Sequence, residues 1–388
     1  MSARLSLCVA FISTTLLVLP AYLTGGLSPF IRREMGFDIA GIGAAVSLFY
    51  AAATVSSIVA GRLGTRFGPE RMIAIAAAIS AVALLSIGTI ASDWASLATF
   101  LALAGLGNAI VQPVTSALVV RDQPATREGL SFGILQSAIP STTLLVGLVL
   151  PSVGSLGLNW RLPFLIAGIL QLPIIVLAIR YRRPLPPRLP KGTPKPEEIR
   201  IDPLPLILLT FVGALIAAPA NALGSYYVES SIHSGYTTSM AGAMLVMGSV
   251  VGIIARLVWG WIIDRRGIDP RIAMAGLLIA GGIGFGAMVF SSLPPIMMIA
   301  TLLAFGAGWA WKGLFHLSAV QYAPHAVSSV VGTVQIGIFA GSVVGPVSFG
   351  LITQHVSYSA AWLCSAGVFF LATVLLLIQR RVSKRPAR

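Results

Sequence analysis

The stretch GWIIDRRG at residues 260–267 has a counterpart in GRLGTRFG at residues 61–68, 199 positions earlier. Each stretch is bounded by glycines, carries basic residues and follows a long apolar run. A second pair has the same offset, because GILQ at 133–136 aligns with GTVQ at 332–335. Two pairs at one offset indicate a chain built from two duplicated halves.

The composition is that of a membrane protein. Apolar residues make up 56% of the 388 positions and charged residues only 10%, with a mean hydropathy of +0.90. Soluble domains are roughly 25% charged, so most of this surface must face lipid. A spanning helix needs about 20 apolar residues. The sequence therefore predicts twelve transmembrane helices, at residues 5–29, 40–61, 71–91, 95–119, 129–151, 160–180, 204–228, 239–263, 271–291, 295–320, 327–353 and 358–380.

The positions of Lys and Arg predict the orientation. With the N-terminus inside, 21 of the 26 Lys and Arg residues fall on the inner side and three on the outer side. The prediction is an all-α membrane protein of two pseudo-symmetric six-helix bundles, with both termini cytoplasmic. The bundles are residues 1–180 and 204–388, and a Pro-rich basic cytoplasmic linker, residues 181–203, joins them.

The composition also excludes several functions. The net charge of +14 would suit nucleic acid, but the charges lie in short loops between spans, so nucleic acid is not an expected partner. Cys8 and Cys364 both lie inside apolar runs, so neither a disulfide framework nor a metal site is expected. We find no His–Asp pair for catalysis, and we predict neither an enzyme nor a cofactor.

The glycine-bounded stretches resemble the signature loop of the major facilitator superfamily, glycine-x-x-x-Asp-Arg-x-Gly. The second copy fits in full through Asp264, Arg265 and Gly267, whereas Thr65 replaces the usual Asp in the first copy. The resemblance covers the whole chain, including its twelve predicted helices and central loop. It implies a cytoplasmic gate formed by Asp264, Arg265 and Arg66. The alternative is that these charges only anchor the chain on the inner side.

Two cations and a histidine are unusual because they lie within predicted spans. Arg256 lies in the eighth helix, and Lys312 and His316 lie one turn apart in the tenth. A cation in mid-membrane costs about 2.5–3.5 kcal/mol on insertion scales, and such residues usually face a cavity. The alternative for Arg256 and Lys312 is that they extend to the membrane surface, and the alternative for His316 is that it only lines the inner vestibule.

No Asp or Glu lies within a predicted span, so the two cations lack a carboxylate partner in the sequence. We therefore expect an anionic substrate, most simply a carboxylate, gripped by Arg256 and Lys312. Arg256 also resembles the eighth-helix Arg of monocarboxylate carriers, and an Arg with a Lys resembles oxalate/formate-type antiporters. In those antiporters the Lys is on helix eleven, whereas Lys312 is on helix ten.

In this superfamily helices 1, 2, 4, 5, 7, 8, 10 and 11 line the cavity, which implies further substrate-binding residues. Asn108, Gln112 and Thr115 form one face of the fourth helix; they either line the cavity or bind a neighbouring helix. The other neutral candidates on cavity helices are Gln136, Gln335, Asn221 and Tyr226.

Glycines and prolines predict where helices approach closely or bend. Gly337, Gly341 and Gly345 indicate close helix contact. Pro140 and Pro346 are predicted to interrupt helices five and eleven and are candidate flexing points.

The predicted function is secondary active transport of a small organic anion, most simply a monocarboxylate, by alternating access. A drug or multidrug exporter of the same fold and a carrier of cyanate-like small anions are the alternatives. Protons are a candidate co-substrate, carried by His316 or by the substrate, and anion exchange and facilitated uptake also stay open. We expect a monomer in the lipid bilayer of the inner (plasma) membrane.

Overall fold

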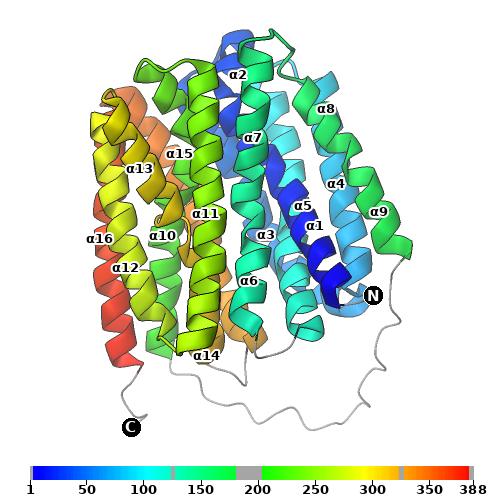
Figure 1. The fold of residues 1–388 in the computed structure, drawn as a ribbon. Helices are drawn as coiled ribbons and strands as arrows, with labels where there is room; N and C mark the ends of the chain where they lie inside the picture. The colour runs from blue at the N-terminus through cyan, green and yellow to red at the C-terminus, as the bar shows by residue number, and fades with distance from the viewer. Residues whose placement is uncertain (1–2, 124–126, 181–202, 323–326, 384–388) are drawn as a thin grey trace.

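The computed structural model describes residues 3–123, 127–180, 203–322 and 327–383, except for the side chains of residues 3, 57–66, 117, 120, 128 and 327–329. The described residues form helices and their connections, and twelve candidate spans lie among them. Figure 1 shows a single elongated bundle with α2 at one end and the chain termini toward the other. Following the predicted orientation, we call the end with α2 the outer end and the opposite end the inner end.

Most spans are one helix each, and four comprise two or more helical pieces. The N-terminal half consists of α1 (Ala3–Gly26), α2 (Ser28–Met35), α3 (Ile39–Phe67), α4 (Pro69–Thr89), α5 (Trp94–Asp122), α6 (Glu128–Gln136), α7 (Ala138–Gly154), α8 (Leu162–Ile169) and α9 (Gln171–Arg180). The C-terminal half consists of α10 (Pro203–His233), α11 (Thr238–Arg266), α12 (Pro270–Ala287), η2 (Met288–Phe290), α13 (Pro294–Gly306), α14 (Trp311–Tyr322), α15 (Val327–His355) and α16 (Tyr358–Val382).

Several helices continue beyond the apolar runs that predict them. The helix α10 extends to His233 and so includes Glu229, and α11 extends to Arg266 and so includes Asp264. The helix α4 begins at Pro69 and buries Glu70 in its first turn. These carboxylates lie just beyond the predicted apolar runs, at helix ends, because hydrogen bonding carries a helix past the last apolar residue into the interface.

The fifth and the tenth spans are each broken in the middle of the bundle. The fifth span is divided between α6 and α7 next to Pro140, as predicted. Pro346 was expected to interrupt the eleventh span, but α15 continues through it. The tenth span is divided between α13 and α14, at a Gly-containing segment for which the apolar run gave no signal. A break in mid-membrane exposes backbone groups that must find partners inside the protein.

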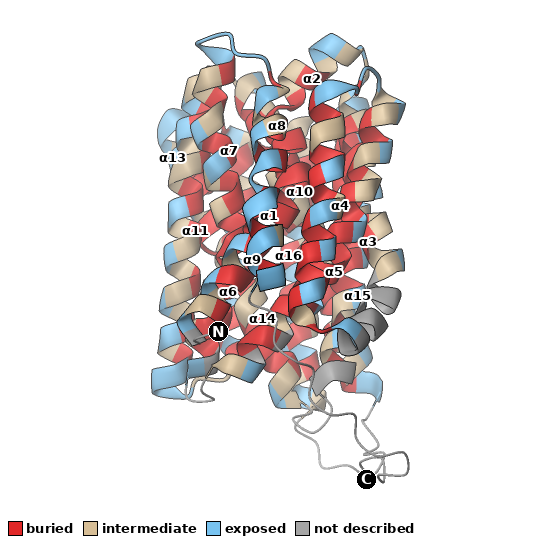
Figure 2. Cartoon of the chain, turned by 90° about the vertical axis from the view of Figure 1, so that its right-hand side faces the viewer, coloured by how far each residue is buried: buried red, intermediate tan, exposed pale blue. Residues whose placement is uncertain are grey.

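Several helix pairs join the halves. The helix α3 packs on α15, and α11 packs on α6 and α7. Buried residues face the interior of the bundle, as Figure 2 shows, while apolar side chains such as Val82 (57% exposed) and Leu363 (56% exposed) point outward. An apolar exterior around a packed interior is what a bilayer requires.

Close backbone contact explains the predicted glycine stripe. Gly337, Gly341 and Gly345 lie one turn apart on α15, where that helix crosses α10. A Cβ atom at Gly341 would collide with the carbonyl of Ala214. The small residues therefore permit close backbone contact between α15 and α10.

Candidate functional site

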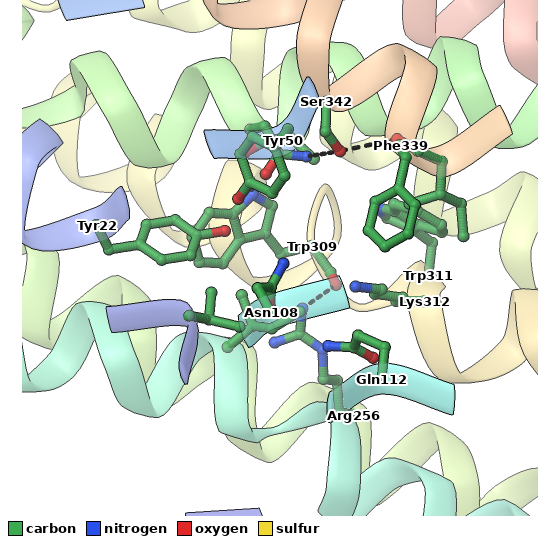
Figure 3. Close-up of a pocket in the computed structure, with 15 residues that line it drawn as sticks. Tyr22, Tyr50, Asn108, Gln112, Arg256, Trp309, Trp311, Lys312, Phe339 and Ser342 are labelled. Carbon is green, nitrogen blue, oxygen red and sulfur yellow. Dashed lines mark hydrogen bonds between the residues drawn. The ribbon is translucent and has the colours of Figure 1, made fainter. Parts of the chain in front are cut away.

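A cavity lies at the centre of the bundle, between the two halves (Figure 3). Its volume is about 40 Å³, and because one water requires roughly 10–15 Å³ on this measure, it suits a ligand of only a few atoms. The polar and aromatic residues that line it are Tyr22, Tyr50, Asn108, Gln112, Asn221, Arg256, Trp309, Trp311, Lys312, Phe339 and Ser342.

Arg256 projects from α11 into this cavity and is only 4% exposed. Its Nη2 donates to the carbonyl of Trp309 at 2.5 Å, while Nε and Nη1 are buried without a hydrogen-bond partner. A buried guanidinium with only one of its nitrogens paired is energetically costly. Arg256 lines the cavity, so a ligand bound there would offer an acceptor close to these unpaired donors.

Lys312 is the second residue of α14 and lines the same cavity as Arg256. Figure 3 shows the Lys312 amine and the Arg256 guanidinium on the same side of this cavity. Within the described part of the chain, the carboxylates that form ion pairs do so with arginines outside the cavity, and neither Arg256 nor Lys312 is among those pairs. Two positive groups thus share a small cavity without a protein carboxylate to balance them.

His316 lies one turn below Lys312 and does not line the cavity. Its Nδ1 donates to the carbonyl of Lys312 at 2.8 Å, and its Nε2 lies 3.3 Å from Oε1 of Gln335. In a neutral ring that donates from Nδ1, Nε2 can only accept a hydrogen bond. If the Gln335 amide is turned by 180°, its NH2 group takes the place of Oε1 and donates to Nε2. The structure therefore joins His316 and Gln335 in one pair on the inner side of the cavity.

The polar face of α5 has two different roles. Asn108 and Gln112 line the cavity, and Oδ1 of Asn108 is buried without a partner. Thr115 instead contacts α1, where Thr14 Oγ1 lies 3.4 Å from its hydroxyl. Cavity lining and interhelical contact, which the sequence left as alternatives, both occur on the same face, one turn apart.

The other neutral candidates are distributed between the cavity and its surroundings. Asn221 lines the cavity and donates to Ser342 Oγ at 2.9 Å. Gln136 is fully buried, with both amide atoms lacking a partner, but it does not line the cavity. Tyr226 lies nearer the outer end, where its hydroxyl is 3.3 Å from the carbonyl of Ile39. Tyr226 therefore contacts the other half rather than the cavity.

Aromatic residues form much of the cavity wall, and the sequence did not identify Tyr22 and Tyr50 among them. Trp309 packs edge-on against Tyr22 at 5.7 Å, and its Nε1 donates to the carbonyl of Ala220 at 2.8 Å. Trp309 and Trp311 are both buried. A single aromatic residue in an apolar helix gives no signal of which way it points.

At the inner end, Asp264 binds the N-terminus of a helix in the other half. Its Oδ1 accepts the N–H of Gly129 at 3.1 Å, and its Oδ2 accepts the N–H of Leu130 at 2.9 Å. A carboxylate stabilises the free N–H groups and dipole of a helix N-terminus. Gly260 permits this approach, because a Cβ there would lie 2.6 Å from the Gly129 carbonyl oxygen.

The other two predicted gating residues differ from Asp264. The Arg265 guanidinium lies over the ring of Trp261, 5.0 Å from its centroid, on an exposed surface. The side chain of Arg66 lies outside the described residues.

The outer end is also joined across the halves. Arg32 of α2 forms an ion pair with Glu229 of α10 at 2.5 Å, and Ser28 donates to the same carboxylate at 2.6 Å. In the middle of the bundle, Ser47 Oγ donates to the carbonyl of Val343 at 2.6 Å. The central cavity thus lies between contacts at both ends.

Comparison with known proteins agrees with this architecture. The fold matches the crystal structure of a bacterial homolog of the human lysosomal transporter Spinster, in an inward-facing and occupied conformation, with a TM-score of 0.76 and 14% identity over 98% of each chain. The multidrug resistance efflux pump PmrA homolog of Lactococcus lactis subsp. lactis (strain IL1403) is 24% identical over 335 residues, which cover 82% of this chain and 80% of that pump.

The glycine betaine/proline/ectoine/pipecolic acid transporter OusA of Dickeya dadantii (strain 3937) is 24% identical over 292 residues, which cover 67% of this chain and 56% of OusA. The chain spans about half the length of the first relatives that it matches, 45% and 56%. Residues 10–311 match the profile of the Major Facilitator Superfamily. Since this match covers well over half of the sequence, the chain belongs to the Major Facilitator Superfamily of membrane transporters.

Proposed function

We propose that this transporter moves a small organic anion, of the monocarboxylate class, across the plasma membrane by alternating access. The observation that carries the proposal is the pair of cations in the central cavity, Arg256 and Lys312, which lack a carboxylate partner among the described residues. A bound anion would balance this charge and accept the free donors of Arg256.

The size of the cavity and one relative support a small carboxylate. A volume of about 40 Å³ suits an ion of a few non-hydrogen atoms. OusA is named for glycine betaine, proline, ectoine and pipecolic acid, each of which carries a carboxylate. Asn108 and Gln112 would donate hydrogen bonds to the anion from α5.

The orientation and the gate belong to the same proposal. We place both termini in the cytoplasm, with the bundles of residues 1–180 and 204–388 moving about the cavity as a monomer. Asp264, with Arg265 and Arg66, would hold the cytoplasmic side closed, and its contact with α6 supports that role. His316 and its partner Gln335 would line the inner route, together with Gln136.

A multidrug exporter is the second candidate, because several relatives are named as multidrug resistance proteins. Unpaired positive charge in the cavity disfavours cationic drugs as cargo. Neutral and cationic compounds therefore belong in the test beside the anions.

Proteoliposome uptake of labelled formate, acetate, lactate, cyanate and oxalate, with and without a pH gradient, tests the proposal. We expect uptake of at least one monoanion, and about a 100-fold loss of transport in Arg256→Gln, because a charge-assisted contact to the anion is removed. Arg33→Gln, at an exposed outer position, is the matched control and should transport normally. Transport of neutral or cationic compounds alone would overturn the proposal.

A further inference from the structure

The tenth span is broken in the middle of the bundle, beside the cavity. The helix α13 ends at Gly306, and the N–H groups of Ala307 and Gly308 both donate to the carbonyl of Leu303, at 2.9 and 3.0 Å. The chain then turns and a new helix, α14, begins at Trp311. The carbonyl of Leu303 in the last turn of α13 therefore has two donors, and α14 begins with a new N-terminus in the middle of the span.

The first N–H groups of a helix have no acceptor within that helix. In α14 these belong to Trp311, Lys312 and Gly313, and none of the backbone bonds across the described turns and caps reaches them. Ala310 precedes the helix, and alanine offers no side-chain oxygen to cap it. Within a bilayer each unsatisfied group costs several kcal/mol, so these donors require a partner from the cavity that Trp311 and Lys312 line.

The guanidinium of Arg256 is a second, independent feature at the same place. It is 4% exposed, its Nη2 occupies the carbonyl of Trp309, and its Nε and Nη1 have no partner. The arginine thus satisfies the carbonyl of Trp309 and keeps two buried donors without a partner beside the cavity that it lines (Figure 3). The unpaired nitrogens of Arg256 and the first N–H groups of α14 therefore belong to residues at one cavity, and both favour a negatively charged ligand.

We propose that the N-terminus of α14 is itself part of the anion site, so that the transported carboxylate lies between the Arg256 guanidinium and the N–H groups of Trp311, Lys312 and Gly313. This inference rests on the proposed anion transport and adds a backbone component to it. A helix N-terminus favours anions through its free N–H groups and its dipole. The broken helix then has a function: an unbroken tenth span would present no N-terminus to the cavity.

Substitution of Ala310 tests the proposal, because it occupies the N-cap position. A serine there would accept the N–H groups of Lys312 or Gly313, and an aspartate would place a tethered carboxylate on them. We expect Ala310→Ser and Ala310→Asp to weaken anion binding by about tenfold or more, with Ala310→Asp the weaker binder. Ala310→Gly adds no acceptor, so it is the matched control and should bind as the wild type does.

Lactate and acetate titrations of the purified protein, read by the fluorescence of Trp309 and Trp311 in the cavity wall, measure binding directly. Thermal unfolding establishes that each variant is folded. If Arg256→Gln loses binding while Ala310→Ser and Ala310→Asp bind as the Ala310→Gly control does, the role of α14 is overturned and the anion site stands. If the wild type binds neither anion and transports none of the panel, the proposed function itself fails.

Discussion

Arg256 is buried at a cost in stability that the proposed anion site would explain. Its guanidinium is buried, with one hydrogen bond to the carbonyl of Trp309 and two nitrogens without partners. A buried charge without a partner is retained against its cost in stability only where it has a use. Stability and transport should therefore respond in opposite directions when this residue is changed.

We predict that Arg256→Gln lowers anion transport by about 100-fold but does not lower the melting temperature, and raises it if the cavity stays dry. Arg256→Lys should keep the charge but lose about tenfold or more in transport, because an ammonium cannot reproduce the planar guanidinium with its several donors. Uptake assays and thermal unfolding in detergent measure the two effects. A strongly destabilised Arg256→Gln would contradict this account, since it would mean that the guanidinium is structural.

Asp269 is a residue with the opposite role, because it stabilises the inner end of the C-terminal half. Its Oδ1 accepts the N–H of Arg271 at 3.0 Å, and its Oδ2 accepts Nε of Arg380 at 2.7 Å. Burial by itself would raise the pKa of Asp269, but the hydrogen bonds from Arg380 and Arg271 outweigh it and bring the pKa below its usual value. The carboxylate thereby joins α12 to α16.

We predict that Asp269→Asn lowers the stability by about 1–2 kcal/mol at pH 7. Because the folded-state pKa is lowered, this contribution is present above the unfolded pKa of about 3.9 and is lost as the pH falls through the folded value. Melting temperatures of wild type and variant should therefore begin to converge as the pH falls below about 4, and meet only below the folded-state pKa. A difference that stays constant between pH 7 and pH 3 would rule out the charge as its source.

At the scale of helices, the contact between α15 and α10 depends on the absence of side chains. Gly341 lies against the carbonyl of Ala214, and Gly345 lies against the carbonyl of Ala218. Backbone contact of this kind supplies the packing that the hydrophobic effect cannot supply between helices in lipid. A larger residue would have to separate the two helices.

We predict that Gly341→Val lowers stability by roughly 2–3 kcal/mol through overpacking. Gly276→Ala in α12 is the matched control, because nothing lies within 4 Å of a Cβ at that position. Alanine there should leave the melting temperature unchanged or raise it slightly. Equal behaviour of the two variants in thermal unfolding would show that the α10–α15 contact does not require glycine.

For the whole molecule, the contacts that join the halves differ between the two ends. At the outer end, an ion pair links Arg32 to Glu229. At the inner end, Asp264 caps α6 through the N–H groups of Gly129 and Leu130. Alternating access requires that the contacts at one end open while those at the other end stay closed. Weakening the contacts at either end should therefore shift the balance between outward-open and inward-open conformations.

We predict that Glu229→Gln favours opening at the outer end and that Asp264→Asn favours opening at the inner end. A cysteine at Ser342, in the cavity wall, should react faster with an impermeant maleimide added outside when Glu229→Gln is present. The same cysteine should react more slowly with the maleimide when Asp264→Asn is present. The native cysteines, Cys8 and Cys364, are exposed and would first be replaced by serine.

The charge reversal Arg32→Glu with Glu229→Arg is the control for this experiment. The reversed pair restores the attraction and should return the labelling rate to that of the parent protein. Equal labelling rates in all these variants would exclude the ion pair and the helix cap as determinants of the conformational equilibrium.

The sequence by itself determined the helices, their number and the residues that cannot face lipid. An apolar run of about 20 residues has the length of a helix that crosses the bilayer. Twelve such candidate spans lie among the described residues. Because cations are rare within membrane spans, the sequence also predicted that Arg256 and Lys312 face a cavity. These conclusions depend on composition and on the cost of charge in lipid, which are local properties of the chain.

The tertiary structure alone decided how those residues meet. Tyr22 and Tyr50 line the cavity, Tyr226 and Gln136 do not, and no local pattern distinguishes these cases. The break before Trp311 was equally hidden, because a broken span and an unbroken one can have the same apolar composition. Partners for backbone groups and charges in a membrane come from neighbouring helices, so their identity depends on packing across the two halves.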